Sequence, residues 1–239
     1  MGTLIIVRHG QASFMAENYD QLSALGQTQA QLLAQAWASA GLRFDCVGSG
    51  PRERQKHTAQ AVAAAYAAVG LEFPQIESYP EFDEYQADAV LSAGLPMLCA
   101  RDPCAAELER KFTTAGDMGA RHAAFQQMFE YVMVRWVRGD LVLNGVESWA
   151  EFRTRVNAGI NRLLADNEPS GRMAIFTSAG PMAIAVQRAL GISDERTLAL
   201  SWMPRNASWS DFVCTPEKFT LSTFNAYGHL FDPAHLTYR

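Results

Sequence analysis

Two basic side chains, Arg8 and His9, stand at the end of an apolar run near the beginning of the sequence. The run, residues 3–7, is typical of a strand buried on both faces, and such strands in open α/β sheets lead into ligand crevices at their carboxyl ends. Gly10 follows directly and lets the backbone turn sharply and come close to a bound molecule. These residues alone support a binding site and an ordinary surface pair about equally.

A second group of cations follows a turn at residues 49–51 and opens an alanine-rich helix. Arg52, Arg54 and Lys56 lie in its first turn, where the helix dipole is already positive. The N–H groups at a helix start bind phosphate, and the planar guanidinium group suits phosphate oxygens. Because neighbouring parallel strands end at the same edge of a sheet, we expect Arg8 and Arg54 to converge on one anion. The alternative is that these cations simply face solvent.

Together these segments resemble the histidine phosphatase superfamily, which has the phosphoglycerate-mutase-like fold. The residues that carry the resemblance are Val7-Arg8-His9-Gly10 and Ser49-x-Pro51-x-x-Arg54-x-x-x-Thr58-Ala59. The resemblance implies that His9 is a nucleophile that takes a phosphoryl group, while Arg8 and Arg54 hold the phosphoryl oxygens. A neutral imidazole attacks phosphorus in line, and fixed cations stabilise the charge that spreads over the equatorial oxygens. Chemistry of this type needs no metal and no cofactor.

The reaction also needs a proton for the leaving oxygen, and three acidic side chains follow the third expected strand at residues 73–80. A carboxylic acid whose pKa is raised by partial burial can supply that proton. The resemblance places the acid in an apolar-x-Glu pattern, which Phe82-Asp83-Glu84 matches, so Glu84 is the expected donor. Glu81 and Asp83 remain alternatives, and all three side chains could instead only solvate a loop.

A departure from the family pattern lies at the end of the expected strand at residues 172–177. The resemblance implies a second histidine followed by glycine there, and this sequence has Ser178 and Ala179. A serine keeps one hydrogen-bond donor but loses the ring and any positive charge. Loss of such a transition-state donor lowers the rate by roughly 10²–10³-fold in other enzymes. We expect Ser178, the N–H group of Ala179 at the next helix start, and Gln11 to contact the phosphate.

Three functional hypotheses follow from these residues. The first is a phosphatase that hydrolyses a small phosphomonoester through a phosphohistidine intermediate. Ser178 motivates the second, a binding protein for phosphoryl compounds that keeps the fold but catalyses little. The third and weaker hypothesis is a phosphoglycerate mutase, which would carry a Glu-Ser-x-x-Asn type of sequence after the first Arg-His-Gly. This chain has Gln11-Ala12-Ser13-Phe14-Met15 at that place.

The elements that must position these residues alternate along the chain. Ser23 caps a helix that stops at Gly41, and a short strand follows at residues 44–48. A helix between two strands indicates a right-handed βαβ unit and a parallel sheet. We therefore expect one domain over residues 1–239, an α/β fold with three α/β/α layers and a mostly parallel central sheet.

Further local patterns complete this expected domain. A polar loop is predicted at residues 14–20, and Ser148 with Glu151 predicts a capping box at the start of a helix that reaches about residue 166. Two strands at residues 206–210 and 218–225 are expected on either side of a turn at 215–217. His229 is interpreted as a packing residue.

Residues 86–144 break the alternation of strands and helices. Pro96, Pro103, Gly116 and Gly119 divide this stretch before a longer amphipathic helix at residues 120–138. We interpret it as a helical insertion over the carboxyl edge of the sheet, a lid that would select the non-phosphate part of a substrate. The same stretch could form the contact of a homodimer.

Composition restricts the possible partners. With 49% hydrophobic and 19% charged residues, the chain has an ordinary globular composition, and its net charge of −5 argues against a broad nucleic-acid-binding face. The sequence has neither a membrane-spanning apolar run nor a cationic leader, which predicts a cytoplasmic location. Its four cysteines lack the spacing of a zinc site, so we expect no metal and no disulfide. A small phosphorylated substrate is the expected partner.

Overall fold

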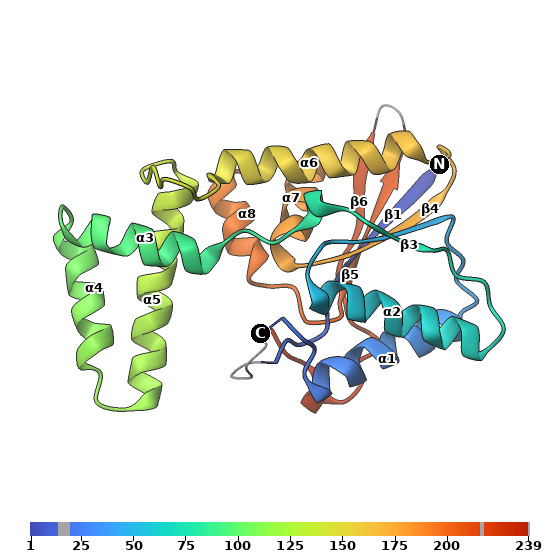
Figure 1. Cartoon of the computed structure of the whole chain (residues 1–239), viewed down its shortest axis with the longest axis horizontal. Coiled ribbons are helices and arrows are strands. Elements are labelled where there is room, and N and C mark those ends of the chain that lie inside the picture. Colours follow the sequence, from blue (N-terminus) through green and yellow to red (C-terminus); the bar gives the residue numbers. More distant parts are fainter. Residues whose placement is uncertain (14–19, 216–217, 239) are drawn as a thin grey trace.

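The computed structural model describes residues 1–13, 20–215 and 218–238. Its centre is a six-stranded sheet in the order β3-β2-β4-β1-β5-β6, with helices on both faces (Figure 1). The strands are β1 (Gly2–Arg8), β2 (Cys46–Ser49), β3 (Ile76–Ser78), β4 (Arg172–Thr177), β5 (Trp209–Cys214) and β6 (Phe219–Ala226). The first four are parallel to one another, whereas β5 pairs antiparallel with β1 and β6 pairs antiparallel with β5. The expected mostly parallel α/β sheet is confirmed.

Two hydrophobic cores lie on opposite faces of this sheet. Helices α1 (Ala24–Ser39) and α2 (Glu53–Ala68) cover one face, and α6 (Trp149–Asp166) and α7 (Ala179–Leu190) cover the other (Figure 1). Strand β1 divides its side chains between them, because Ile5 and Val7 belong to the core under α1 and α2 while Leu4 and Ile6 belong to the opposite core. This strand is therefore buried on both faces, as its apolar run predicts.

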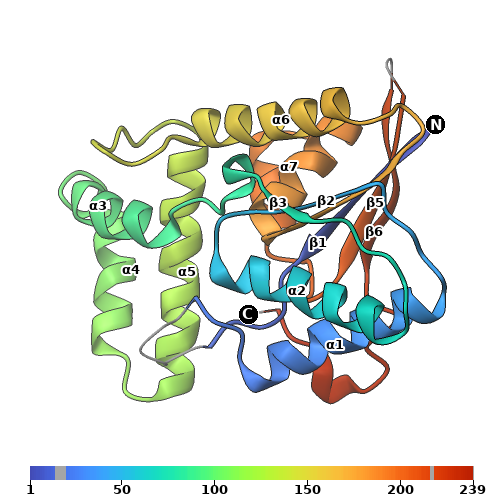
Figure 2. The ribbon, with the colours of Figure 1, turned by 45° about the vertical axis from the view of Figure 1, so that its right-hand side comes forward.

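The predicted helical insertion forms a group of three helices that projects beyond one end of the sheet (Figures 1 and 2). The helices are α3 (Ala87–Cys99), α4 (Pro103–Thr114) and α5 (Met118–Val137). Helix α5 contacts α6 and α8 (Asp194–Ser201), and aromatic side chains fill the contacts. The ring centroids of Trp136 and Trp149 are 5.5 Å apart, and those of Phe129 and Trp202 are 6.3 Å apart. None of the helices in the described ranges is both long and apolar enough to cross a bilayer.

Several predicted boundaries are confirmed by the hydrogen bonds that set them. The Ser23 hydroxyl accepts from Gly26 N at the start of α1, and Ser148 with Glu151 forms the capping box of α6. Two predictions fall partly outside the described residues, namely the loop at 14–20, of which 14–19 are not described, and the turn at 215–217, of which 216–217 are not described.

The predicted strand at residues 206–210 is wrong at its beginning, because β5 starts at Trp209. Ala207 has a left-handed backbone with φ 57°, which cannot continue a strand. The side-chain amide of Asn206 and the N–H group of Ala207 both donate to His9 O, at 3.3 and 3.1 Å. This segment is therefore a turn that fastens the end of β1 rather than a strand.

Candidate active site

The carboxyl ends of β1, β2 and β4 bring the predicted site residues to one edge of the sheet. Arg8 pairs in register with Thr177, and Ser49 pairs with Phe176, so His9, Gly50 and Ser178 follow at neighbouring positions. Gly10 then turns the chain against α1, where a Cβ atom on Gly10 would lie 2.3 Å from Gly26 O. Thr58 fixes this turn, since its hydroxyl accepts from Gly10 N at 3.1 Å. The motif residues Gly10 and Thr58 thus hold the chain beside His9.

His9 is 6% exposed, and both of its ring nitrogens have hydrogen-bond partners. Nδ1 lies 2.6 Å from Gly10 O, and Arg54 Nε lies 3.0 Å from His9 Nε2. A carbonyl oxygen can only accept and a guanidinium N–H can only donate, so Nδ1 carries the proton and Nε2 keeps its lone pair. Burial lowers the pKa of His9 well below 6.5, and the charges of Arg54 and Arg8 lower it further. The imidazole is therefore neutral and has a lone pair on Nε2.

Two buried arginines flank this imidazole, as the sequence predicts. Arg8 and Arg54 are each 8% exposed. Arg8 Nη1 donates to Pro204 O, and Arg8 N donates to Ser208 O at 2.9 Å, so the segment before β5 holds the first arginine. Arg54 comes from the first turn of α2 and contacts His9 directly. Both cations lower the pKa of His9, which shows that their charges act on the same group.

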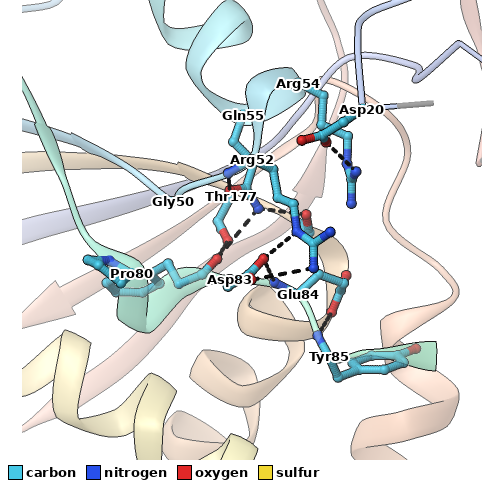
Figure 3. A network of polar contacts seen from close by, with 12 residues as sticks. Asp20, Gly50, Arg52, Arg54, Gln55, Pro80, Asp83, Glu84, Tyr85 and Thr177 are labelled. Carbon is cyan, nitrogen blue, oxygen red and sulfur yellow. Dashed lines mark hydrogen bonds and ion pairs between the residues drawn. The ribbon is translucent and has the colours of Figure 1, made fainter. Parts of the chain in front are cut away.

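Two cations at the start of α2 form ion pairs with carboxylates, and the sequence does not predict these pairs. Arg54 Nη1 lies 2.6 Å from Asp20 Oδ1, and Arg52 Nε lies 2.5 Å from Asp83 Oδ1 (Figure 3). Asp20 also accepts from Glu53 N at 2.9 Å, at the positive end of the helix. Lys56 is exposed. Acidic residues from two other loops therefore compensate the unfavourable charge pattern, and no signal in the local sequence identifies them.

Glu84 is the carboxylate that the loop after β3 directs toward this edge. Its Oε2 accepts from Gly180 N and its Oε1 accepts from Tyr85 N, both at 3.1 Å. Burial raises the pKa of Glu84, although these two N–H groups and the charges of Arg54 and Arg8 lower it. The arginines therefore act on Glu84 as they act on His9. A raised pKa is what a proton donor requires.

The two alternative acids are engaged elsewhere. Asp83 forms the ion pair with Arg52 and also accepts from Glu84 N at 2.8 Å. Glu81 points to α6, where Arg162 Nη1 lies 3.2 Å from its Oε1. Both carboxylates are occupied by ion pairs with arginines, Arg52 and Arg162, so Glu84 is the acid that this geometry favours.

The loop that carries Glu84 is held through four consecutive carbonyl groups. Arg155 Nη1 donates to Pro80 O, Glu81 O and Asp83 O, at 3.5, 2.9 and 3.1 Å. The Thr177 hydroxyl donates to the remaining one, Phe82 O, at 2.6 Å. The other side of the Arg155 guanidinium forms two 2.7 Å contacts with Glu147. Sequence reasoning missed Arg155, because its partners are backbone atoms more than seventy residues away.

The remaining predicted phosphate contacts have mixed environments. Ser178 is 1% exposed, and its hydroxyl accepts from Gln55 Nε2 at 2.8 Å. The side-chain oxygen of Gln11 accepts from Ser23 Oγ at 2.8 Å, so this side chain also supports the start of α1. Ala179 begins α7, but the next N–H group, that of Gly180, serves the Glu84 carboxylate. Phosphate contacts by Ser178, Gln11 and Ala179 remain predictions.

The edge of this mostly parallel sheet presents a neutral histidine, two buried arginines and a half-buried acid, an arrangement that suits phosphoryl transfer. Consistent with this, the chain belongs to the histidine phosphatase superfamily (branch 1), whose family model matches residues 4–90 and 109–227. The unmatched residues between these two segments lie in α3 and α4. Helix α5, by contrast, lies within the matched residues.

Solved structures confirm the fold at low sequence identity. The α-ribazole phosphatase of Shigella flexneri is 20% identical, with a TM-score of 0.59 over 94% of this chain and 96% of that one. A phosphoserine phosphatase of Entamoeba histolytica, solved with phosphoserine, is 16% identical, with a TM-score of 0.63 over 97% and 100%. A phosphoglycerate mutase of Bacillus anthracis is 15% identical, with a TM-score of 0.60 over 95% and 94%. No sequence among the curated proteins matches the chain.

Proposed function

We propose that this protein is a phosphatase that hydrolyses a small phosphomonoester through a phosphohistidine intermediate at His9. The observation that carries the proposal is the fixed tautomer of His9, whose Nδ1 proton is held by Gly10 O while Nε2 faces Arg54 Nε. Two structurally similar proteins named as phosphatases, from Shigella flexneri and Entamoeba histolytica, support the same reaction class.

In the first step, the Nε2 lone pair of His9 attacks the phosphorus atom in line with the leaving oxygen. The Nε2–P bond forms and the bond from phosphorus to the leaving oxygen breaks, while Glu84 gives its proton to that oxygen. Arg54 exchanges its hydrogen bond with Nε2 for one with a phosphoryl oxygen, and Arg8 stabilises the remaining equatorial charge. The products are a free alcohol and phosphohistidine.

In the second step, the Glu84 carboxylate takes a proton from water as that water attacks the phosphohistidine. The new P–O bond forms, the P–Nε2 bond breaks, and inorganic phosphate leaves. The histidine returns to its starting tautomer because Gly10 O holds the Nδ1 proton throughout. Glu84 has then regained its proton, and the site is ready for the next turnover.

The proposal is tested with p-nitrophenyl phosphate and the variant His9→Ala. We expect the parent to hydrolyse this ester and His9→Ala to lose the activity, because the nucleophile is absent. The matched control is His57→Ala, since His57 lies three residues beyond Arg54 on α2 and is exposed. Rapid quenching of the parent with a radioactive phosphate ester should trap acid-labile label on His9. Equal turnover by His9→Ala and parent would sink the proposal.

A second candidate function is a binding protein for phosphoryl compounds with little catalysis. The observation that favours it is that Ser178, at the strand end where the family resemblance implies a second histidine, is buried and hydrogen-bonded to Gln55. Labelled phosphohistidine during turnover would exclude this candidate, and tight phosphate binding without turnover would favour it. Assays with phosphoglycerates and a bisphosphate primer separately test the weaker mutase hypothesis.

A further inference from the structure

Gln55 and Ser178 form a buried polar pair beside the candidate nucleophile. Gln55 is 0% and Ser178 1% exposed, and Gln55 Nε2 lies 2.8 Å from Ser178 Oγ. Gln55 directly follows Arg54 in the first turn of α2. Two consecutive helix residues therefore contact two neighbouring positions of the sheet edge, Arg54 at His9 and Gln55 at Ser178.

The orientation of the Gln55 amide follows from a group that can only donate. Gln55 Oε1 lies 3.1 Å from the backbone N–H of Arg52, so the oxygen of the amide must face that N–H group. The amide NH₂ group then faces Ser178, where it can only donate. Ser178 Oγ is consequently the acceptor in this pair, and its own proton points to another acceptor.

Within residues 1–13, 20–215 and 218–238, the hydrogen-bond partner of the Ser178 hydroxyl is Gln55, which donates to it. These residues provide no acceptor for the hydroxyl proton. Ser178 follows Thr177, whose carbonyl accepts from His9 N at 2.9 Å and whose strand pairs in parallel with β1. Ser178 and His9 thus leave the sheet side by side at the edge where the phosphoryl group would bind.

We propose that Gln55 is a positioning residue that makes Ser178 an obligate donor to a phosphoryl oxygen. The inference rests on the phosphatase function proposed above. Gln55 donates to one lone pair of the Ser178 hydroxyl, and the hydroxyl proton is left for a phosphoryl oxygen. The pair supplies two neutral groups at the strand end where the family resemblance implies a second histidine.

A neutral donor has a chemical consequence at this site. Arg8 and Arg54 already lower the pKa of His9. A third cation in this buried pocket would be repelled by both arginines. The Ser178 hydroxyl donates at every pH at which the protein is folded, because it does not titrate. Gln55 acts through Ser178 and touches no reacting atom.

The test compares Ser178→Ala, Gln55→Ala and the double variant in turnover of p-nitrophenyl phosphate. Removal of one transition-state donor in Ser178→Ala should lower kcat by about 10²-fold. Gln55→Ala, in which the hydroxyl is free to rotate, should lower kcat by about tenfold. In the Ser178→Ala background the Gln55 substitution should change kcat less than about twofold, because the two residues act as one unit.

Inhibitor binding provides a measurement that does not need turnover. Orthovanadate adopts the five-coordinate geometry of the transition state, so its inhibition constant should rise in Ser178→Ala by about the factor by which kcat/KM falls. Inorganic phosphate, which resembles the ground state, should bind within about threefold of its affinity for the parent. Gln55→Glu should weaken vanadate further, because its carboxylate accepts the Ser178 proton and repels the anion.

Matched controls exclude a general effect on folding. Ser201→Ala removes another buried hydroxyl, on α8, and Gln187→Ala removes another partly buried glutamine amide, on α7. Both should keep the parental kcat. A Gln55 effect that persists undiminished in the Ser178→Ala background would show a structural role and overturn the inference. An active parent with an unchanged Ser178→Ala variant overturns only this inference, whereas a parent without turnover and without vanadate binding overturns both proposals.

Discussion

The Glu84 carboxylate accepts a hydrogen bond from Gly180 N at 3.1 Å, which joins the loop after β3 to the first turn of α7. The approach is so close that a Cβ atom on Gly180 would lie 2.0 Å from Glu84 Oε1 and 2.8 Å from the Tyr85 ring. The position of the candidate acid therefore depends on a glycine from a different element.

Gly180→Ala should displace the Glu84 carboxylate while it leaves His9 and Arg54 in place. We expect kcat to fall by about 10²-fold for alkyl phosphates, because a poor leaving group needs the proton most. Turnover of p-nitrophenyl phosphate should fall less. Gly116→Ala is the control, since a Cβ atom there meets no atom within 4 Å. Equal losses on both esters would contradict a defect in the acid.

Glu84→Gln keeps the shape of the side chain but removes the transferable proton. The loss of kcat on an alkyl phosphate should be about 10²–10⁴-fold, as for other general acids. Asp83→Asn is the comparison, because Asp83 is the neighbouring carboxylate and is paired with Arg52. If Asp83→Asn loses the greater share of activity on alkyl esters, the assignment of Glu84 is wrong.

The pH profile of kcat/KM should be bell-shaped, with an acid limb set by His9 and an alkaline limb set by Glu84. Burial, with Arg54 and Arg8, lowers the pKa of His9 well below 6.5, so the nucleophile is lost only when the pH falls through that low value. Burial raises the pKa of Glu84 above 4.5, so the acid is lost when the pH rises through this raised value. The alkaline limb should therefore disappear in Glu84→Gln while the acid limb remains.

Arg155→Ala should loosen the loop that carries Glu84. It removes the donor shared by three backbone carbonyls and leaves Glu147 without its cation, so we expect unfolding to become easier by about 1–3 kcal/mol. The value of kcat should fall more than KM changes. The control is Arg153→Ala on the same helix, whose ion pair with Asp194 is more exposed and worth at most about 1 kcal/mol. Chemical denaturation measures both variants.

His229 should make the protein less stable in acid. The side chain is 5% exposed and packs on Trp209 with ring centroids 5.2 Å apart, and burial lowers its pKa to about 4. Between this value and the ordinary 6.5 the unfolded chain binds a proton that the folded chain does not, so stability falls as the pH falls. The full effect is about 3 kcal/mol. His229→Leu should flatten the stability curve over this range, whereas the exposed His57→Gln should not.

The sequence was most informative where one short segment determines the geometry. Arg8, His9 and Gly10 belong to one strand and its turn, and the parallel order of β1, β2 and β4 follows from the intervening helices. Arg8 and Arg54 both lie close enough to His9 to lower its pKa, and their convergence on one anion remains a prediction. Periodicity and capping signals are local, and they therefore predicted these elements.

Residues that act through long-range hydrogen bonds could not be found in this way. Arg155 binds backbone carbonyl groups, which every residue has and which therefore leave no sequence signal. Asp20 is one of many acidic residues, and only the structure shows its ion pair with Arg54. Asn206 and Ala207 were predicted as strand residues, because the residue type alanine does not indicate the left-handed φ that Ala207 adopts. Gln55 has no local signal in its alanine-rich helix, and only its hydrogen bond with Ser178 distinguishes it.

The turn before β5 has a consequence for how the protein is made. Arg8 and His9 are translated before the groups that hold them, because the carbonyl of Pro204 and the amide of Asn206 lie 196 and 197 residues later. A nascent chain therefore exposes Arg8 and His9 before the groups that fix them have been made. We expect the proposed activity to begin only after residues 204–206 have been synthesised and have folded against the end of β1.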